Sequence, residues 1–371
     1  MKIIFLTSNI NEPRVTNRIA DFYERGYELE VFCYCRDPER PFRKEEGIEY
    51  HMLGDLGRGA SSYFKRLSAE YADVSKIVKD FKGRDVVFYL INNDMALLYH
   101  LIRGKHPYVY EEADLRHTYF GSGILIRLFE YLDKRIISKS MLTVFLSKGF
   151  ARFHYGEKTV PENVTFLFNK LNPRIVDYPY SRIRIPDPNH LRIGFVGTIR
   201  FESVFNFVKV VCRSFPQHEV HFYGLPVSES KDSFEKILNY SNCVYHGPFS
   251  NPSDLPAIYS EIDMVLSTYD TRYDNVRYAE PNKIYESVYF EVPIIVSTGT
   301  YLAERVSSMD IGYTVDAMDD AEVISLINRL TGEDLLRKSA NAHMVPKSEC
   351  IMDNDDFFSI FEARLKKFRQ Q

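Results

Sequence analysis

The sequence predicts an α/β protein of two doubly wound domains, each a parallel sheet with helices on both faces. Three observations lead to this prediction. The chain has 371 residues, more than a single hydrophobic core usually serves. Short apolar runs alternate with segments of helical spacing along the chain. A block with three prolines, Tyr178–Asn189, interrupts that alternation, which then starts again, so this block is the predicted linker.

The first half contains five apolar runs typical of strands and three segments with helical spacing. The chain's last helical pattern, at about 353–371, has acidic residues in its first turn and basic residues in its last, as the helix dipole favours. We therefore expect an N-terminal domain over 1–180, with this last helix packed back on it. The predicted strands are Ile3–Leu6, Glu30–Cys35, Val86–Leu90, Tyr108–Tyr110 and Met141–Leu146, and the helices are Arg14–Arg25, Tyr63–Phe81 and Ile124–Ile137.

The second half repeats the pattern and predicts a C-terminal domain over 190–352, facing the first across a cleft. In parallel sheets of this kind, ligands bind outside the carboxyl ends of the strands. The predicted strands are Leu191–Val196, His218–Tyr223, Val244–His246, Met264–Ser267 and Pro293–Val296, and the helices are Ser203–Phe215, Lys231–Tyr240 and Ser253–Ser260.

Composition narrows the class of protein. Apolar residues make up 45% and charged residues 26%, as in soluble globular proteins, and no apolar run is long enough to cross a bilayer. Five scattered cysteines argue against a disulfide framework and favour the cytoplasm. The net charge of −4 speaks against nucleic acid as a partner. The segment Ile124–Tyr155 mixes basic and apolar residues, which fits an ordinary amphipathic helix and strand or peripheral contact with an anionic inner membrane.

The stretch Asp263–Ser297 has the pattern strand, helix, strand. Glu280-Pro281 predicts a helix start, because proline is favoured at the first helical position, and the free amides there would face the cleft. Lys283 lies in the first turn and Glu286 follows on the same helical face. A cation for phosphate beside a carboxylate for ribose hydroxyls suits a nucleotide-diphosphate site. Spacing alone, however, fits an ordinary solvated Lys–Glu pair better.

The stretch AEPNKIYESVYFEVPIIVS resembles the donor-site signature of the GT-B glycosyltransferases. Within that group it is similar to the nucleotide-sugar-dependent enzymes of the large retaining family often numbered four, especially those of bacterial surface and capsular polysaccharide synthesis. Weaker stretches in the expected order extend the resemblance over nearly the whole chain. They are NEPRVTNRIADFYERGYELEVFCYCRD, YEEADLR, FEYLDKRIISKSMLTVFLSKGF, LRIGFVGTIR and NCVYHGPF.

The resemblance implies a donor site. Glu286 would accept hydrogen bonds from the ribose, and Lys283 and Arg200 would hold the two phosphates and stabilise the leaving group. Two cations together with helix amides can stabilise the negative charge of the nucleoside diphosphate that leaves, so no metal or other cofactor is expected. Tyr269 would belong to the loop that lines the sugar pocket. The predicted donor-binding residues are Gly197, Arg200, Tyr269, Asn282, Lys283, Ile284 and Glu286.

The acceptor side is less specific. Asp114 or Glu112 could orient or deprotonate the acceptor hydroxyl, but the leaving phosphate can take that proton itself, and Asp114 fits a helix cap equally well. Asn11 and Arg14 lie after the first strand, near acceptor or donor, or cap the first helix. The predicted acceptor-side residues are Asn11, Arg14, Glu112 and His117, with Asp114 as a catalytic candidate beside Arg200 and Lys283.

Because of one departure from the family pattern, the sequence does not predict which sugar is transferred. Related retaining enzymes often carry a second glutamate near the sugar, seven intervening residues before the ribose-binding one. That position is Tyr278 here, and Glu280 is two residues out of register.

The implied activity is metal-independent transfer of a sugar from a nucleotide-diphosphate donor to a hydroxyl of a glycan or lipid-linked glycan, with retention of anomeric configuration. Two alternatives remain open. One is a sugar-nucleotide epimerase of the same fold, and the other is a non-catalytic nucleotide-sugar-binding subunit of a transferase complex.

Overall fold

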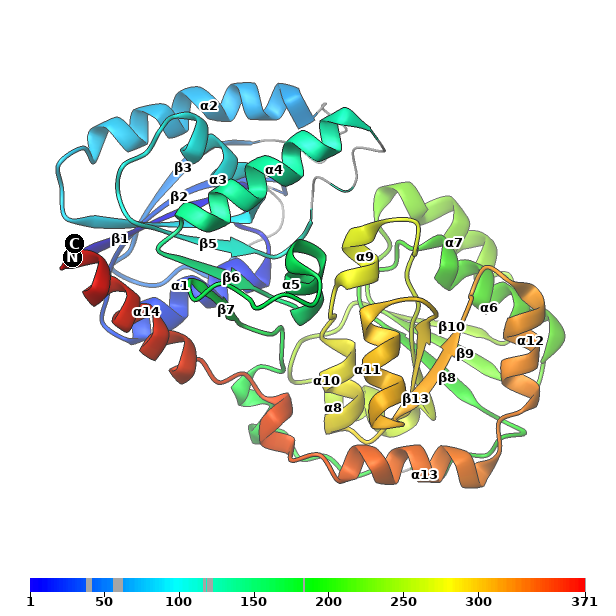
Figure 1. Ribbon diagram of the computed structural model, residues 1–371. Helices are drawn as coiled ribbons and strands as arrows, with labels where there is room; N and C mark the ends of the chain where they lie inside the picture. Colours follow the sequence, from blue (N-terminus) through cyan, green and yellow to red (C-terminus); the bar gives the residue numbers. More distant parts are fainter. Residues whose placement is uncertain (38–41, 56–62, 116–117, 119–122, 183, 371) are drawn as a thin grey trace. The chain divides into compact units, whose positions relative to one another are not determined.

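The computed structural model describes residues 1–37, 42–55, 63–115, 118, 123–182 and 184–370 (Figure 1). The chain divides into two compact units, Met1–Phe168 with Asn354–Gln371, and Asn169–Asp353. The second unit thus begins before residue 180, where the sequence analysis ended the N-terminal domain. The proline-rich block is anchored to this unit. The Tyr180 hydroxyl donates to the Phe290 carbonyl at 2.6 Å, and Arg184 Nε donates to Asp263 at 2.8 Å.

The first unit is built on a seven-stranded parallel sheet of order β3-β2-β1-β4-β5-β6-β7. The chain runs outward from β1 to β3 and then crosses to β4, so the strand order reverses between β1 and β4. The strands are β1 Lys2–Thr7, β2 Glu28–Cys35, β3 Glu49–Asp55, β4 Val86–Ile91, β5 Tyr108–Glu112, β6 Leu142–Phe145 and β7 Val164–Phe166. The helices are α1 Pro13–Glu24, α2 Tyr63–Asp80, α3 Asn92–Leu101, α4 Ile124–Lys139, α5 Lys148–Tyr155 and α14 Asp355–Arg369.

The C-terminal helix α14 belongs to the first unit and lies beside α1 (Figure 1). Its apolar residues Phe357, Phe358 and Phe361 recur on one helical face and are buried. Each ring meets Phe22 of α1 edge to face, with ring centroids 6.0, 4.8 and 5.3 Å away respectively. Edge-to-face packing of this kind adds to the gain from burial alone.

The second unit contains a six-stranded parallel sheet of order β10-β9-β8-β11-β12-β13, and its strand order reverses between β8 and β11. The strands are β8 Arg192–Val196, β9 Glu219–Tyr223, β10 Cys243–Gly247, β11 Met264–Ser267, β12 Ile294–Ser297 and β13 Gly312–Val315. The helices are α6 Glu202–Ser214, α7 Lys231–Ile237, α8 Leu255–Glu261, α9 Asp274–Tyr278, α10 Lys283–Tyr289, α11 Tyr301–Met309, α12 Asp320–Asn328 and α13 Gly332–His343.

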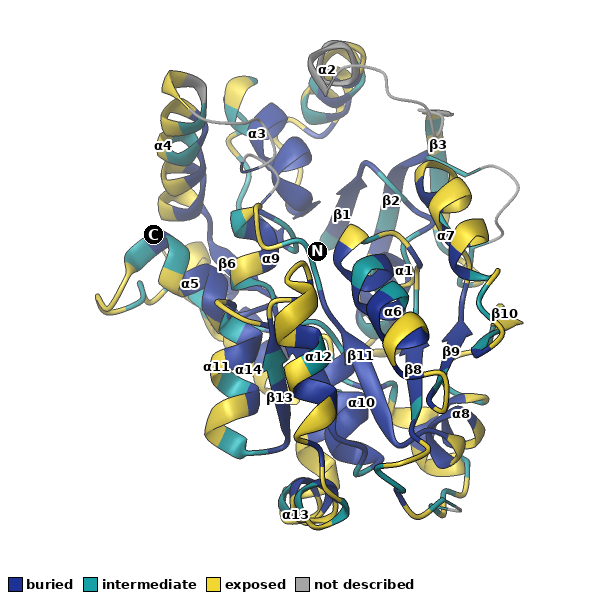
Figure 2. Cartoon of the chain, turned by 90° about the vertical axis from the view of Figure 1, so that its right-hand side faces the viewer, coloured by how far each residue is buried: buried dark blue, intermediate teal, exposed yellow. Residues whose placement is uncertain are grey.

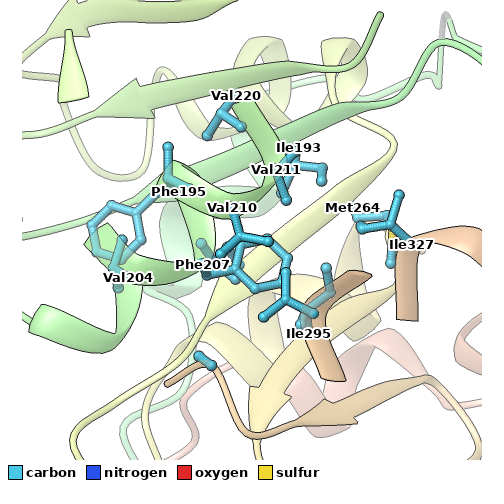
Figure 3. Packing of buried hydrophobic residues seen from close by; sticks show 14 of the residues in the cluster. Ile193, Phe195, Val204, Phe207, Val210, Val211, Val220, Met264, Ile295 and Ile327 are labelled. Carbon is cyan, nitrogen blue, oxygen red and sulfur yellow. The ribbon is translucent and has the colours of Figure 1, made fainter. Parts of the chain in front are cut away.

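The core of the second unit fills the space between this sheet and helices such as α6. Figure 3 shows Ile193 and Val220 of the strands packed with Val204, Phe207 and Val211 of α6, all fully buried. Because these residues fix β8 and its neighbours, the loops at the carboxyl ends of the strands are held on a rigid support. Among the described helices, none combines the length and the apolarity that crossing a bilayer requires.

Candidate functional site

The second sheet brings two glycine loops together at its reversal point. Gly197 follows β8 with φ 140°, and Gly224 follows β9 with φ 136°. A Cβ built on Gly224 would lie 1.9 Å from the Gly197 carbonyl oxygen, so the two backbones pack directly on each other. A Cβ on Gly197 would lie 3.8 Å from Lys283 Cε. The lysine side chain therefore lies against the loop that leaves β8.

Lys283 and Glu286 form a buried ion pair on α10. The Lys283 Nζ donates to both carboxylate oxygens of Glu286 at 2.7 Å. Asn282 Nδ2 donates to Oε1 and the Tyr259 hydroxyl donates to Oε2, each at 2.6 Å. Glu286 has no exposed surface and Lys283 is 7% exposed. The alternative of a solvated surface pair is therefore wrong, and each oxygen of Glu286 accepts from two donors.

The helix begins later than the sequence predicts. Asn282 is the N-cap and α10 starts at Lys283, so Pro281 precedes the helix instead of opening it. The Pro281 carbonyl accepts from the Ile284 amide at 3.4 Å, which forms a turn before the first regular helical bond. All seven residues of α10 are buried, and Ile284 packs in the core. In so short a helix, the charge at the site comes from side chains more than from a helix dipole.

Arg200 and Tyr269 lie together after the two strands that flank the reversal. Arg200 is exposed, and its guanidinium lies 4.7 Å from the centre of the Phe201 ring. That ring meets the Tyr269 ring edge to face at 4.8 Å. Burial raises the pKa of Tyr269, and the positive charge of Arg200 partly opposes the rise. Arg200 and Gly197 belong to one loop, and the Gly197 end of that loop lies against Lys283. Both cations therefore border the same loop.

Glu280 is held by residues that the sequence analysis did not connect with it. Its Oε1 accepts from Arg305 Nη1 of α11 at 2.7 Å and from the Tyr285 hydroxyl. The residue is 5% exposed, and its Oε2 is buried without a hydrogen bond from any described residue. Tyr259 and Arg305 were both missed as contributors, because each lies more than twenty residues from its carboxylate and no local pattern marks it.

The first sheet also gathers polar groups at its reversal point. Arg14 Nη1 donates to Glu111 Oε1, and Arg14 Nη2 donates to Glu12 Oε2, each at 2.6 Å. Glu111 is fully buried at the end of β5 and also accepts from Arg18 Nε at 3.0 Å. Burial alone would raise the pKa of Glu111, but Arg18 and Arg14 outweigh it and hold the pKa below its usual value. Arg14 keeps 16% of its side chain exposed.

Asn92 was not predicted as part of this region. It follows β4 with φ 70°, a left-handed conformation that costs strain in residues other than glycine. Its side chain is fully buried, and Oδ1 accepts from Arg14 Nη2 at 3.4 Å. The signal in the sequence was an Asn-Asn pair directly after an apolar run, since asparagine tolerates this conformation better than most residues.

The remaining acceptor-side candidates differ in how far they are buried and in what they contact. Asn11 Oδ1 accepts from the backbone N–H groups of Arg36 and Asp37 at 3.1 and 3.0 Å, so it fastens the loop after β1 to the end of β2. Asp114 is half-buried in the loop that follows β5. Glu112 has no exposed surface through which it could touch an acceptor. His117 lies outside the described residues.

Two doubly wound domains, each with polar groups gathered where its strand order reverses, define the fold of the GT-B glycosyltransferases. No family model matches the chain. The structure is similar to HepE of Anabaena in complex with UDP and glucose, with a TM-score of 0.66 and 14% identity over 100% of both chains. It is also similar to sucrose-phosphate synthase of Thermosynechococcus elongatus, with a TM-score of 0.70 and 13% identity over 100% of this chain and 99% of that one.

A third similar structure is WaaG, a glycosyltransferase involved in lipopolysaccharide biosynthesis, with a TM-score of 0.62 and 14% identity over 94% of this chain and 97% of that one. By sequence, the chain is 20% identical over 346 residues to the succinoglycan biosynthesis protein ExoL of Rhizobium meliloti strain 1021. That match spans 89% of this chain and 85% of ExoL. The fold predicted from the sequence is thereby confirmed.

Proposed function

We propose that this protein is a glycosyltransferase of polysaccharide biosynthesis. It moves a sugar, with retention, from a nucleotide-diphosphate donor to a hydroxyl of a glycan or lipid-linked glycan. The observation that carries the proposal is the buried Lys283–Glu286 pair against Gly197, at the reversal point of the second sheet. Structures of the similar protein HepE with UDP and with UDP-glucose support a nucleotide sugar as donor. The match to ExoL supports a role in polysaccharide synthesis.

The Lys283–Glu286 pair suits a nucleotide diphosphate because the lysine can move away from the glutamate. Lys283 has a flexible stem of four carbons, so its ammonium can turn from Glu286 to a phosphate beside the Gly197 loop. Glu286 then keeps the donors Asn282 and Tyr259 and gains the ribose hydroxyls in place of the ammonium. The exposed Arg200 supplies the second cation for the diphosphate. Both cations would stabilise the negative charge that grows on the leaving group, without a metal.

The acceptor hydroxyl must lose a proton as the new bond forms. In a retaining front-side reaction, the leaving phosphate can take that proton, so no protein base is required. Asp114, half-buried after β5, is the side chain that we assign to orienting the acceptor, with Arg14 nearby in the same unit. Glu112 is fully buried, so we assign it no contact with the acceptor.

The test is turnover of a panel of UDP-, GDP- and dTDP-sugars by the purified chain, with and without a lipid-linked glycan acceptor. We expect one donor to release its nucleoside diphosphate in an acceptor-dependent manner. Conversion of a donor into its epimer without acceptor would identify an epimerase. Saturable donor binding with no turnover under any condition would identify a non-catalytic subunit.

Helix α4 supports contact between this enzyme and an anionic membrane. Ile124, Leu128 and Tyr131 recur at helical spacing along α4 and are 87%, 49% and 58% exposed. Figure 2 shows much of this helix in the yellow of exposed residues. The exposed charged residues of α4 are all basic, namely Arg127, Lys134, Arg135 and Lys139. A helix that presents apolar and basic side chains together suits the surface of an anionic bilayer. Such contact would bring the enzyme to a lipid-linked acceptor.

Reversing two of these charges, with Arg127→Glu and Arg135→Glu together, should weaken binding to phosphatidylglycerol vesicles by at least about 30-fold. The estimate follows from about 1 kcal/mol for each basic residue at the surface. Co-sedimentation at low salt measures the effect. The matched control is Lys76→Glu with Lys79→Glu, exposed lysines on α2 of the same unit. Equal binding by the α4 variant and the wild type would remove α4 as the contact face.

A further inference from the structure

The turn between α9 and α10 sets the position of Lys283, the first residue of α10. It comprises residues 279–282. A side-chain oxygen at the N-cap often fixes such a turn by accepting from a free amide of the helix. Asn282 occupies the N-cap but makes no such bond, and its side-chain amide instead donates to Glu286 Oε1 at 2.6 Å. Another contact must therefore hold the turn.

Glu280 provides this contact by joining the turn to two helices. Its Oε1 accepts from Arg305 Nη1 of α11 at 2.7 Å and from the Tyr285 hydroxyl of α10. The side chain of Glu280 is 1% exposed and that of Arg305 is 31% exposed. Burial and the nearby charge of Glu280 raise the pKa of Tyr285, so its hydroxyl stays protonated and remains a donor. We call Glu280, Tyr285 and Arg305 the Glu280 brace.

The backbone between Glu280 and Lys283 has little freedom. The ring of Pro281 locks its own φ, and a proline also restricts the residue before it. Asn282 is already in the helical region, and its carbonyl accepts from two amides of the first helical turn at 3.0 and 3.1 Å. A carboxylate anchored at position 280 therefore determines where α10 starts and where Lys283 leaves it.

Stability alone does not account for the Glu280 brace. Taking two charges out of water costs free energy, and apolar side chains of similar volume often serve a fold equally well. Glu280 Oε2 is also buried without a hydrogen bond from any described residue, which adds a further cost. The charges of Glu280 and Arg305 cancel, so the brace adds no net charge to the site. It supplies direction instead, because a planar guanidinium binds a carboxylate in a fixed geometry.

We propose that Glu280 and Arg305 are positioning residues of the donor site, which hold the turn before α10 so that Lys283 reaches a phosphate of a nucleoside diphosphate. This inference rests on the donor site proposed above. Glu286 depends less on the turn, because the Tyr259 hydroxyl of α8 binds it independently at 2.6 Å. Loss of the Glu280 brace should therefore weaken the phosphate contact more than the ribose contact.

The variant that tests the proposal is Glu280→Gln with Arg305→Met. It removes both charges together, so neither is left without its partner, and the glutamine oxygen can still accept from the Tyr285 hydroxyl. We expect urea unfolding to show a midpoint close to that of the wild type. In calorimetric titrations, affinity for the tightest binder among UDP, GDP and dTDP should fall about 10-fold, and affinity for the matching nucleoside should not change.

Two single variants support this test. Glu280→Gln alone decides if the double variant misfolds, because it leaves unpaired only Arg305, whose side chain is 31% exposed and can turn to water. It should show the same selective loss of diphosphate affinity. Arg305→Lys keeps a cation for Glu280 but not the planar group, so its diphosphate affinity should lie between those of the wild type and the double variant.

The matched control is Arg184→Met with Asp263→Asn. It removes another buried ion pair of the same unit, in which Arg184 Nε donates to Asp263 at 2.8 Å. Asp263 directly precedes β11, at the amino end of that strand, whereas the donor site lies at the carboxyl ends. This control should therefore leave the affinities for diphosphate and nucleoside unchanged.

The possible results separate this inference from the proposed function. A folded Glu280→Gln variant, single or double, that binds the diphosphate as the wild type does would overturn the inference alone. Equal losses of affinity for diphosphate and nucleoside would also overturn it, because the brace would then support the unit as a whole. If the wild type binds none of the three diphosphates, the donor site itself is wrong and the inference falls with it.

Discussion

Replacing Glu286 by alanine is expected to lower the free energy of unfolding by about 3–5 kcal/mol, because it removes one partner of a buried ion pair. Lys283, 7% exposed, would keep its charge in the interior without the carboxylate that receives it at 2.7 Å. The hydroxyl of Tyr259 and the amide of Asn282 would lose their acceptor as well. Urea unfolding of the purified variant measures the loss, and folded variants should no longer bind nucleotide.

A double variant shows whether Glu286→Ala is destabilised by the loss of the ion pair or by a packing defect. Lys283→Met with Glu286→Leu replaces both charges by apolar side chains of similar volume, and such replacements of buried pairs are often neutral or stabilising. We expect it to recover most of the stability lost in Glu286→Ala without recovering nucleotide binding. Glu235→Ala, an exposed glutamate of α7, should change stability by no more than about 0.5 kcal/mol. If Glu286→Ala unfolds at the same urea concentration as the wild type, the Lys283–Glu286 ion pair does not stabilise the fold.

The arrangement of both sheets could be predicted because buried parallel strands form continuous apolar runs. Met264–Ser267 is such a run, and β11 has the predicted bounds. The strands that the sequence analysis missed, β3, β7 and β13, are all at the edges of their sheets. An edge strand such as Glu49–Asp55 carries polar residues along much of its length, so its pattern is weak. Edge strands are also kept short or polar to avoid pairing with other chains.

The candidate site could be predicted only in part, because a motif records local spacing and not the partners that come from elsewhere in the chain. Lys283 and Glu286 are neighbours on one helical face, so their contact follows from the sequence. Their burial does not, since it depends on α8, which brings Tyr259 to Glu286. Glu112 was misjudged for a similar reason. Its position at a strand end suggested access to a ligand, but α4 and α5 enclose it with Asp133 and His154.

Replacing Lys283 by glutamine should reduce affinity for a nucleoside diphosphate by about 10- to 100-fold, because a hydrogen bond to a charged group contributes about 1.5–3 kcal/mol. Glutamine can still donate to Glu286, so the fold should survive the change. The rate of sugar transfer should fall further, by about 10²–10³-fold, since the lysine stabilises charge that develops on the leaving phosphate. Calorimetric titration with the nucleoside diphosphate and with the nucleoside alone separates a phosphate contact from a general loss of binding.

The comparison of those two ligands decides the role of the lysine. If Lys283 meets the phosphates, the glutamine variant binds the nucleoside as the wild type does and loses affinity only for the diphosphate. If Lys283 only supports Glu286, affinity falls for both ligands alike, because the ribose contact is disturbed. Lys338→Gln is the matched control, since Lys338 is a 5% exposed lysine of the same unit whose Nζ donates to Asp310 at 2.8 Å. It should leave both affinities unchanged, whereas a parallel loss in this control would attribute the effect to destabilisation of the unit.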